Sequence, residues 1–198
     1  MNQKKVWNNI ANEWNKFKKK PSLIAMDFLD KQTGKILDLG SGSGRHLKKI
    51  KKGKMYLVDF SPQMIQQAKQ NSKEKNIDAE FKVSEISKIP YEDNFFNGAI
   101  VISSLHCVET KKQREQTAKE LFRVLKPKSQ ALISVWNIKS KRFKNAPKEK
   151  YIAWREMGKR YYYLYDEKEI HDLFERIGFK IKKKIPHNVN IEFVVEKS

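Results

Sequence analysis

A glycine-rich turn preceded by an aspartate is the first place where residue types and spacing indicate chemistry. Residues 36–47 read ILDLGSGSGRHL, which sets Gly40, Gly42 and Gly44 at alternate positions just after Asp38. Glycine at such a turn lets a ligand approach the backbone and permits a positive φ. The spacing differs from the G-x-G-x-x-G of pyrophosphate-binding turns, and Asp38 would repel a phosphate. The aspartate would instead attract a cation such as an ammonium group, directly or through water.

Two more acidic residues follow later apolar runs. Asp59 ends the next run, fifteen residues after Gly44, where a carboxylate can accept hydrogen bonds from both hydroxyls of a ribose. After the third run, Glu85 can accept from an adenine amino group while Ile86 packs on the ring. The predicted ligand has a cationic group at one end, ribose and adenine at the other, and no phosphate between them. These features describe S-adenosylmethionine.

Short apolar runs alternate with helical stretches along the chain. Five runs are rich in β-forming residues and are typical of buried parallel strands: residues 35–39, 54–59, 79–83, 98–103 and 130–136. The pattern also predicts three helices, at residues 61–75, 112–125 and 167–177. The first begins at a Ser-Pro pair, and the other two stop at Pro127 and Gly178.

The C-terminal residues break this alternation. Residues 179–185 and 190–196 look like two strands joined only by PHNV, which is too short for a crossover helix, so the strands should pair antiparallel. The sequence therefore predicts an α/β fold whose sheet is mostly parallel, with helices on both faces and an antiparallel C-terminal strand pair.

Four segments in order resemble the motifs of class I S-adenosylmethionine methyltransferases, over about residues 35–136. They are LDLGSGSGRHL, LVDFSPQMI, IPYEDNFFNGAIVISSLH and ELFRVLKP. The resemblance implies a Rossmann-like sheet and S-adenosylmethionine as cofactor. Together with the turn it assigns the cofactor contacts to Trp14, Asp38, Gly40, Ser41, Gly42, Gly44, Asp59, Phe60, Ser61, Met64, Glu85, Ile86 and Ser103.

Further segments resemble a narrower family, the tRNA wobble-uridine methyltransferases that esterify a 5-carboxymethyl group. These segments are WNNIANEW, SLHCVE, SVW and GKRYYYLYDEKEI. The family pattern has paired histidines and an R-Y-Y-H-x-F-like segment, whereas His106 is followed by Cys107 and residues 160–165 read RYYYLY. The N-terminal arginine and tryptophan of the family align with Lys18 and Ser22. Loss of that tryptophan leaves the exact nucleoside open.

A carboxylate acceptor is already ionised at neutral pH, so the enzyme has mainly to align it with the methyl group. The resemblance then gives Arg160 or Lys18 the task of holding the carboxylate, and His106 a polar contact near the methyl group. Trp136 and Tyr161 would line the uracil pocket or stack on the uracil ring. Trp136 could equally be core packing, His106 could be a structural hydrogen-bonding residue, and Tyr161 is preferred to its neighbours because it follows Arg160.

The chain carries 42 Lys and Arg against 23 Asp and Glu, a formal net charge of +19. Basic residues concentrate at 16–20, 139–150 and 180–184, while residues 36–102 are closer to balanced. Such a field attracts polyanions, nucleic acid above all, although a lysine-rich proteome would give a similar composition. We expect a tRNA anticodon stem-loop to meet the first two runs, including Arg142 and Lys144. The resemblance also implies a small zinc-containing activator that docks along a sheet edge.

We expect one methyltransferase domain over residues 1–198. Its expected parts are a helical, basic N-terminal arm (1–30), a cofactor-binding core (35–136), a basic substrate-side insertion (137–165), and a C-terminal helix with a strand pair (166–198). No stretch is apolar enough for a membrane span and the first residues lack a signal-peptide core, so cytoplasm is the expected location. Cys107, the only cysteine, is expected to be a buried small residue, and no metal site is expected in this chain.

Two other functions stay open at this point. A small-molecule methyltransferase acting on a quinone or lipid precursor would share the motif IPYEDNFFNGAIVIS and would lack tRNA affinity. A catalytically inactive RNA-binding scaffold could keep the fold, although Asp38, Asp59 and the three glycines of the turn are intact.

Overall fold

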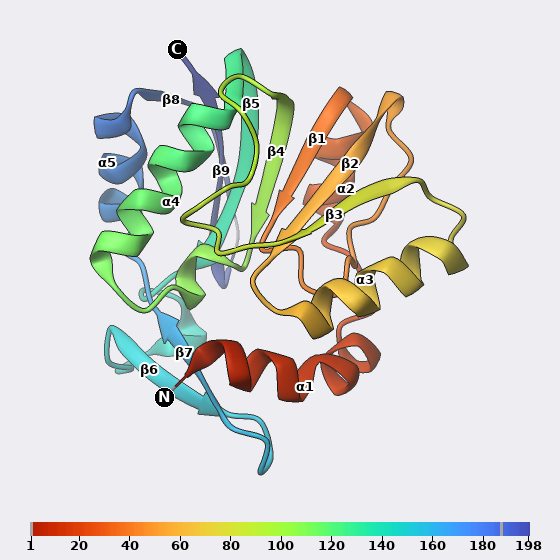
Figure 1. Ribbon diagram of the computed structural model, residues 1–198. Helices are drawn as coiled ribbons and strands as arrows, with labels where there is room; N and C mark the ends of the chain where they lie inside the picture. The colour runs from red at the N-terminus through yellow and green to blue at the C-terminus, as the bar shows by residue number, and fades with distance from the viewer. Residues whose placement is uncertain (1, 187) are drawn as a thin grey trace.

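One twisted sheet of seven strands organises the chain in the order β3-β2-β1-β4-β5-β9-β8 (Figure 1). The computed structural model describes residues 2–186 and 188–198. The strands are β1 (Thr33–Leu39), β2 (Lys51–Asp59), β3 (Ala79–Val83), β4 (Phe96–Ile102), β5 (Leu125–Trp136), β8 (Phe179–Ile185) and β9 (Asn190–Lys197). Pairing is parallel from β3 to β5, and β9 lies antiparallel to both of its neighbours. The predicted fold class is confirmed, while residue 187 of the PHNV connection lies outside the described residues.

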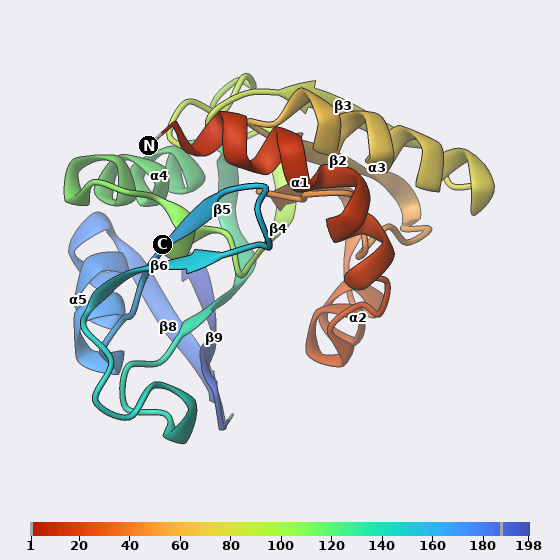
Figure 2. The same cartoon turned by 90° about the horizontal axis from the view of Figure 1, so that it is seen from below.

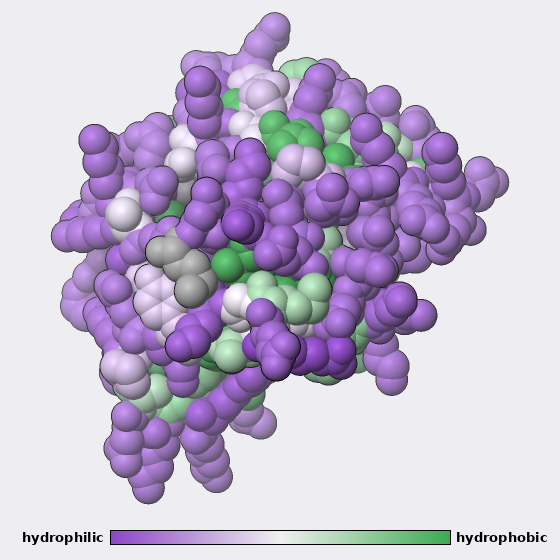
Figure 3. Space-filling view, turned by 60° about the horizontal axis from the view of Figure 1, so that its bottom comes forward, coloured by the Kyte–Doolittle hydropathy of each residue, from purple (hydrophilic) through white to green (hydrophobic). Residues whose placement is uncertain are grey.

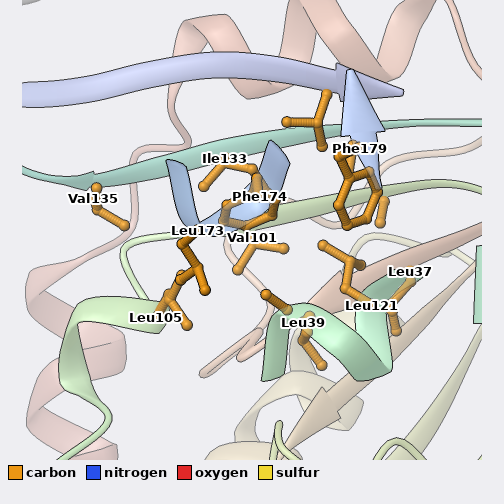
Figure 4. Packing of buried hydrophobic residues seen from close by; sticks show 14 of the residues in the cluster. Leu37, Leu39, Val101, Leu105, Leu121, Ile133, Val135, Leu173, Phe174 and Phe179 are labelled. Atoms are coloured by element: carbon orange, nitrogen blue, oxygen red, sulfur yellow. The ribbon is translucent and has the colours of Figure 1, made fainter. Parts of the chain in front are cut away.

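Alternate residues of the strands face opposite layers of helix. On one face Leu37 and Leu39 join a cluster that includes Leu121 of α4 (Lys111–Val124) and Phe174 of α5 (Glu167–Ile177); Figure 4 shows this packing. On the other face Ile36 and its neighbours pack against α2 (Leu23–Asp30) and α3 (Pro62–Glu74). The apolar runs of the sequence are therefore continuous because both faces of the central strands are buried.

Local signals place the helix ends as the sequence predicts, with one difference. The Ser61 side chain accepts a hydrogen bond from the backbone N–H of Met64 and so caps α3, and Gly178 ends α5 with a φ of +113°. The helix α4 does end before Pro127, at Val124, but β5 begins directly at Leu125, so Pro127 lies within a strand rather than in a loop. The pairing of β4 with β5 is irregular between Phe96 and Gly98, and such an irregularity tolerates a proline within a strand.

Two segments complete the fold below the carboxyl ends of the strands. The helix α1 (Gln3–Phe17) lies across α3, and a hairpin of β6 (Glu149–Ala153) and β7 (Lys159–Tyr163) packs beside it (Figure 2). The predicted basic insertion thus contains a two-stranded sheet that its sequence pattern does not predict. Figure 3 shows that hydrophilic side chains cover most of this side of the molecule. No helix in the described part of the chain is long and apolar enough to cross a membrane.

Candidate active site

A cavity of about 400 Å³ opens where β1, β2 and β4 end, between the glycine turn and α1. Ten of the predicted cofactor contacts line it: Trp14, Gly40, Ser41, Gly42, Asp59, Phe60, Met64, Glu85, Ile86 and Ser103. Asp38, Gly44 and Ser61 are not among its lining residues. These three residues lie behind the cavity wall and support it.

The glycine turn is held against β2 and leaves room in front of it. The backbone N–H groups of Gly40 and Ser41 donate to the Val58 carbonyl over 2.8 and 3.1 Å. A Cβ on Gly40 (φ +72°) would lie 2.2 Å from Cβ of Ser104, whereas a Cβ on Gly42 (φ +54°) would meet nothing within 4 Å. Gly44 instead packs against the sheet side, next to Leu57. Gly40 therefore fixes the turn, and Gly42 borders the space that a ligand would fill.

Asp59 stands at the centre of one wall. Its carboxylate accepts hydrogen bonds from the backbone N–H groups of Gly42 and Ser61, both over 2.9 Å. Burial raises its pKa to about 6, against the lowering effect of those two donors. The carboxylate is thereby fixed in place, and the oxygens keep lone pairs that can accept from two ribose hydroxyls.

Asp38 lies just behind the turn with an unsatisfied oxygen. Its side chain is buried and its Oδ2 has no hydrogen-bond partner, although Nδ1 of His46 lies 3.8 Å away. Burial raises the pKa of Asp38 to about 7, and burial lowers the pKa of His46 to about 3, so the imidazole is neutral. A buried acceptor without a donor fits an ammonium group or a water that bridges to one.

Arg45 lines the same cavity and was not predicted from the sequence. Burial lowers the pKa of its guanidinium, and the charge of Asp38 acts in the opposite direction. A guanidinium in the cavity wall, with a buried acid behind it, fits the two charges of an amino acid. The residues present therefore fit S-adenosylmethionine, with the methionine end toward Asp38 and Arg45 and the ribose at Asp59. A basic residue directly after the third glycine was the signal that could have identified Arg45.

A stack of rings lies next to the cavity on the acceptor side. The Trp136 ring is stacked on Tyr162 at 4.2 Å and on His106 at 4.8 Å between centroids. Nδ1 of His106 accepts a hydrogen bond from the backbone N–H of Trp136 over 3.1 Å, and burial lowers the pKa of His106 to about 3. The neutral ring must therefore carry its proton on Nε2, which can donate to an acceptor. Trp136 stacks on rings of the protein itself but is only partly buried and lies outside the core clusters.

Tyr161, predicted to accompany Arg160, points the other way. Residues alternate along β7, so that Arg160 and Tyr162 share one face. The Tyr162 hydroxyl accepts a hydrogen bond of 2.6 Å from Arg160, while the Tyr161 hydroxyl lies 3.4 Å from Arg114 within the main core cluster. The assignment of Tyr161 is therefore corrected: Tyr162 is the aromatic residue beside Arg160, because a one-residue step along a strand changes the face.

Four basic side chains of this region are close enough for their charges to interact, and they form no ion pair among the described residues. They are Lys18, Arg45, Arg142 and Arg160, which we call the cationic cluster. Burial lowers the pKa of Lys18, and the charges of the other three lower it further. Arg142 lies 5.0 Å from the Trp136 ring, and Arg160 is buried among three tryptophans and Tyr162. Lys144, also predicted to bind substrate, is exposed on the loop that follows Phe143.

Cys107 is an unreactive small residue as expected, but its place differs from the expected one. The residue lines the cavity and is only partly buried, rather than being enclosed in the core. Its Sγ donates to the carbonyl of Ser103 over 3.6 Å, and burial raises the pKa of the thiol to about 12. The thiol therefore stays protonated at neutral pH and serves as a small wall residue.

Comparison with known proteins agrees with this geometry. A family described as a methyltransferase domain matches residues 30–177, which is most of the chain. The chain belongs to this family. A solved S-adenosylmethionine-dependent methyltransferase from Methanosarcina mazei shares the fold, with a TM-score of 0.72 and 22% identity over 90% of this methyltransferase and 98% of that chain.

Two curated relatives carry the names of tRNA methyltransferases. The methyltransferase is 26% identical over 151 residues to the mouse protein named "Probable tRNA methyltransferase 9B", which covers 75% of this chain and 32% of the relative. It is 32% identical over 101 residues to the tRNA (carboxymethyluridine(34)-5-O)-methyltransferase of Arabidopsis thaliana, which covers 51% of this chain and 24% of the relative. The methyltransferase thus spans a third or less of the length of these relatives.

Proposed function

We propose that the chain transfers a methyl group from S-adenosylmethionine to the carboxylate of a 5-carboxymethyluridine in tRNA. The cationic cluster is the observation that carries the choice of acceptor. Lys18 and Arg160 lie 5.8 and 5.2 Å from the ring of Trp14 in the cavity wall, and the charges of Arg142 and Arg160 lower the pKa of Lys18. None of the three has an acidic partner in residues 2–186 and 188–198. A carboxylate on the acceptor would relieve the repulsion among these charges, since a guanidinium binds a carboxylate through two parallel hydrogen bonds.

The similarity to two named tRNA methyltransferases supports the same class of acceptor. When bound, S-adenosylmethionine supplies an electrophilic methyl group on sulfur. The remaining work of the protein is to position the acceptor: Arg160 holds the carboxylate, and the Tyr162 hydroxyl orients the guanidinium. The neutral His106 offers its Nε2 proton, and the rings around Arg160 exclude water from the carboxylate. No general base is required, because the nucleophile is already ionised at neutral pH.

We further propose that a small zinc-containing activator protein binds at the β3 edge of the sheet. The two edge strands differ in charge: β8 carries Lys180, Lys182, Lys183 and Lys184, and lysines along an edge disfavour the addition of another strand. The β3 edge has the sequence AEFKV, and Val83 is 46% exposed there. An added strand would meet fewer positive charges at β3.

The deciding experiment is methyl transfer from labelled S-adenosylmethionine into tRNA from cells that lack this gene, followed by mild alkaline treatment. The protein is assayed alone and together with a zinc-containing activator. The expected product is label in tRNA that alkali removes, because methyl esters hydrolyse in base whereas methyl groups on carbon, nitrogen or ribose oxygen remain. The variant Arg160→Met should lose at least about 100-fold in kcat/KM for tRNA, since a buried charge-assisted contact is removed.

The matched control is Lys141→Met, which removes an exposed basic residue from the start of the basic insertion. This variant should keep its rate within about threefold, as expected for one surface charge. Label that survives alkali would refute the esterification, and tRNA that stays unlabelled despite binding of S-adenosylmethionine would favour the small-molecule acceptor.

A further inference from the structure

The last turn of α1 carries an aromatic side chain that the fold leaves in solvent. Phe17 is 65% exposed, although phenylalanine is among the most often buried residues. Its ring packs edge-on against Trp154 in the hairpin between β6 and β7, with 5.2 Å between centroids. We call Phe17 and Trp154 together the aromatic ridge.

Trp14 connects the aromatic ridge to the cavity. Its ring lies 6.4 Å from that of Phe17 and 5.3 Å from that of Trp154, and Trp14 itself lines the cavity. The guanidinium of Arg160 lies 4.9 Å from the Trp154 ring on the acceptor side. Through Trp154 the ridge therefore borders the guanidinium that would hold an acceptor carboxylate, and Phe17 lies one ring further out.

The hairpin side of the aromatic ridge is fixed in place. Glu13 of α1 accepts hydrogen bonds from Nε1 of Trp154 and from a guanidinium N–H of Arg155, both over 2.9 Å. Gly158 approaches α1 so closely that a Cβ there would lie 3.0 Å from the side chain of Val6. A preorganised aromatic surface loses little conformational entropy when a ligand stacks on it.

The charges around Phe17 indicate what such a ligand would be. Phe17 lies within the run KFKKK at 16–20, and Nζ of Lys18 is 5.2 Å from the centre of its ring. No acidic residue interrupts this run. Exposed rings beside positive charges are the arrangement by which proteins bind single-stranded nucleic acid, with bases on the rings and phosphates on the cations.

We propose that the aromatic ridge stacks a base of single-stranded RNA that flanks the nucleotide entering the acceptor site. This inference rests on the proposed function and deepens it, because it assigns a second base contact outside the cavity. It also favours a loop over a duplex as the bound RNA, since a base in a duplex has no free face to stack on a side chain.

Binding of short RNA analogues to the intact protein tests the ridge without methyl transfer. The probes are a fluorescent oligouridylate of about eight nucleotides, within the usual range of single-strand sites, and an abasic ribose-phosphate oligomer of equal length. The wild-type protein should bind the oligouridylate more tightly. Phe17→Ala should weaken that binding about tenfold, as expected from one lost stacking contact, and leave the abasic oligomer unaffected. Phe17→Trp should retain the binding.

Leu23→Ala is the matched control, because Leu23 is 79% exposed on the neighbouring helix and has no ring. Binding of S-adenosylmethionine within about twofold of wild type confirms the fold of each variant, because neither residue lines the cavity. The ridge is refuted if Phe17→Ala binds oligouridylate as wild type does, if Leu23→Ala loses as much, or if wild type does not distinguish the two oligomers.

The outcomes also separate this inference from the proposed function. Alkali-labile labelling of tRNA with unchanged RNA binding in Phe17→Ala would keep the function and refute the ridge. Base-dependent binding that Phe17→Ala loses, in a protein that does not label tRNA, would keep the ridge and refute the function.

Discussion

The cofactor side and the acceptor side of the cavity are built from different kinds of sequence. The cofactor side comes from the ends of three parallel strands, and its central residues, Gly40, Gly42 and Asp59, lie between the end of β1 and the end of β2, the next strand along the chain. The acceptor side combines α1, the end of β5 and the hairpin strand β7, which meet only after folding. Backbone geometry determines the first side, and the packing of long side chains determines the second.

The largest effect is expected where backbone geometry is tightest. Gly40→Ala should lower the free energy of unfolding by at least about 4 kcal/mol, because the new Cβ overlaps Ser104 and adopts a positive φ. Gly42→Ala should cost only about 1 to 2 kcal/mol, since its Cβ meets no atom within 4 Å. Urea unfolding measures both variants. An equal loss of unfolding free energy in the two variants would show that the contact with Ser104 does not restrain the turn.

The second prediction concerns pH and the buried Asp38. Its pKa of about 7 in the folded chain exceeds the ordinary value of 3.8, so the folded state keeps a proton that the unfolded chain releases. The contribution of Asp38 to the free energy of unfolding is fully present below about pH 4 and is lost as the pH rises to about 7. Asp38→Asn removes that loss, so the free energy of unfolding of the variant should rise relative to wild type by on the order of 4 kcal/mol across this range.

Unfolding midpoints of both proteins between pH 4 and 8 test this difference. The comparison with wild type is necessary because the pKa values of His46 and His106 are lowered, which changes stability in the opposite direction over an overlapping range. A stability gap that does not depend on pH would mean that Asp38 is ionised in the folded chain throughout.

The third prediction tests whether Arg45 recognises the carboxylate of the cofactor. Arg45→Met should weaken binding of S-adenosylmethionine about 10- to 30-fold, the loss typical of a charge-assisted hydrogen bond. Binding of decarboxylated S-adenosylmethionine should change less than about twofold, because that ligand lacks the group in question. Calorimetric titration measures both ligands, and an equal loss for the two would assign Arg45 a structural role instead.

The fourth prediction compares two neighbouring tyrosines on the acceptor side. Tyr162→Phe removes the hydroxyl that accepts from Arg160, and KM for the acceptor should rise about tenfold, as for one lost hydrogen bond to a charged group. Tyr161→Phe removes a hydroxyl that faces Arg114, and KM should change by less than about twofold. Steady-state kinetics on tRNA would contradict the structure if Tyr161→Phe had the larger effect.

The smallest effect is expected at the exposed Lys144. Lys144→Ala should weaken tRNA binding about two- to threefold and reduce the slope of log affinity against log salt by about one. Binding measured at several salt concentrations gives both quantities. An effect as large as that of Arg160→Met would place Lys144 in the acceptor site rather than on the phosphate-binding surface.

Several features were predictable because they depend on residues close together in the sequence. The alternation of apolar runs and helices gave the sheet, since continuous apolar runs require burial on both faces. The turn at Gly40 to Gly44 and the acid at Asp59 identified the ligand-binding edge, because parallel strands bring their carboxyl ends together. The hairpin of β6 and β7 was not predicted, since its strands are short and its stability comes from packing on α1.

The sequence by itself determined the sheet, its C-terminal strand pair and most of the cofactor wall. Only the tertiary structure decided which tyrosine joins Arg160, that Arg45 faces the cavity, and that Arg142 lies over Trp136 while Lys18 and Arg160 lie over Trp14. The physical reason is distance along the chain: a turn or a strand follows from local backbone preference and apolar period, whereas a cluster of side chains from α1, β5 and β7 exists only once the core brings them together.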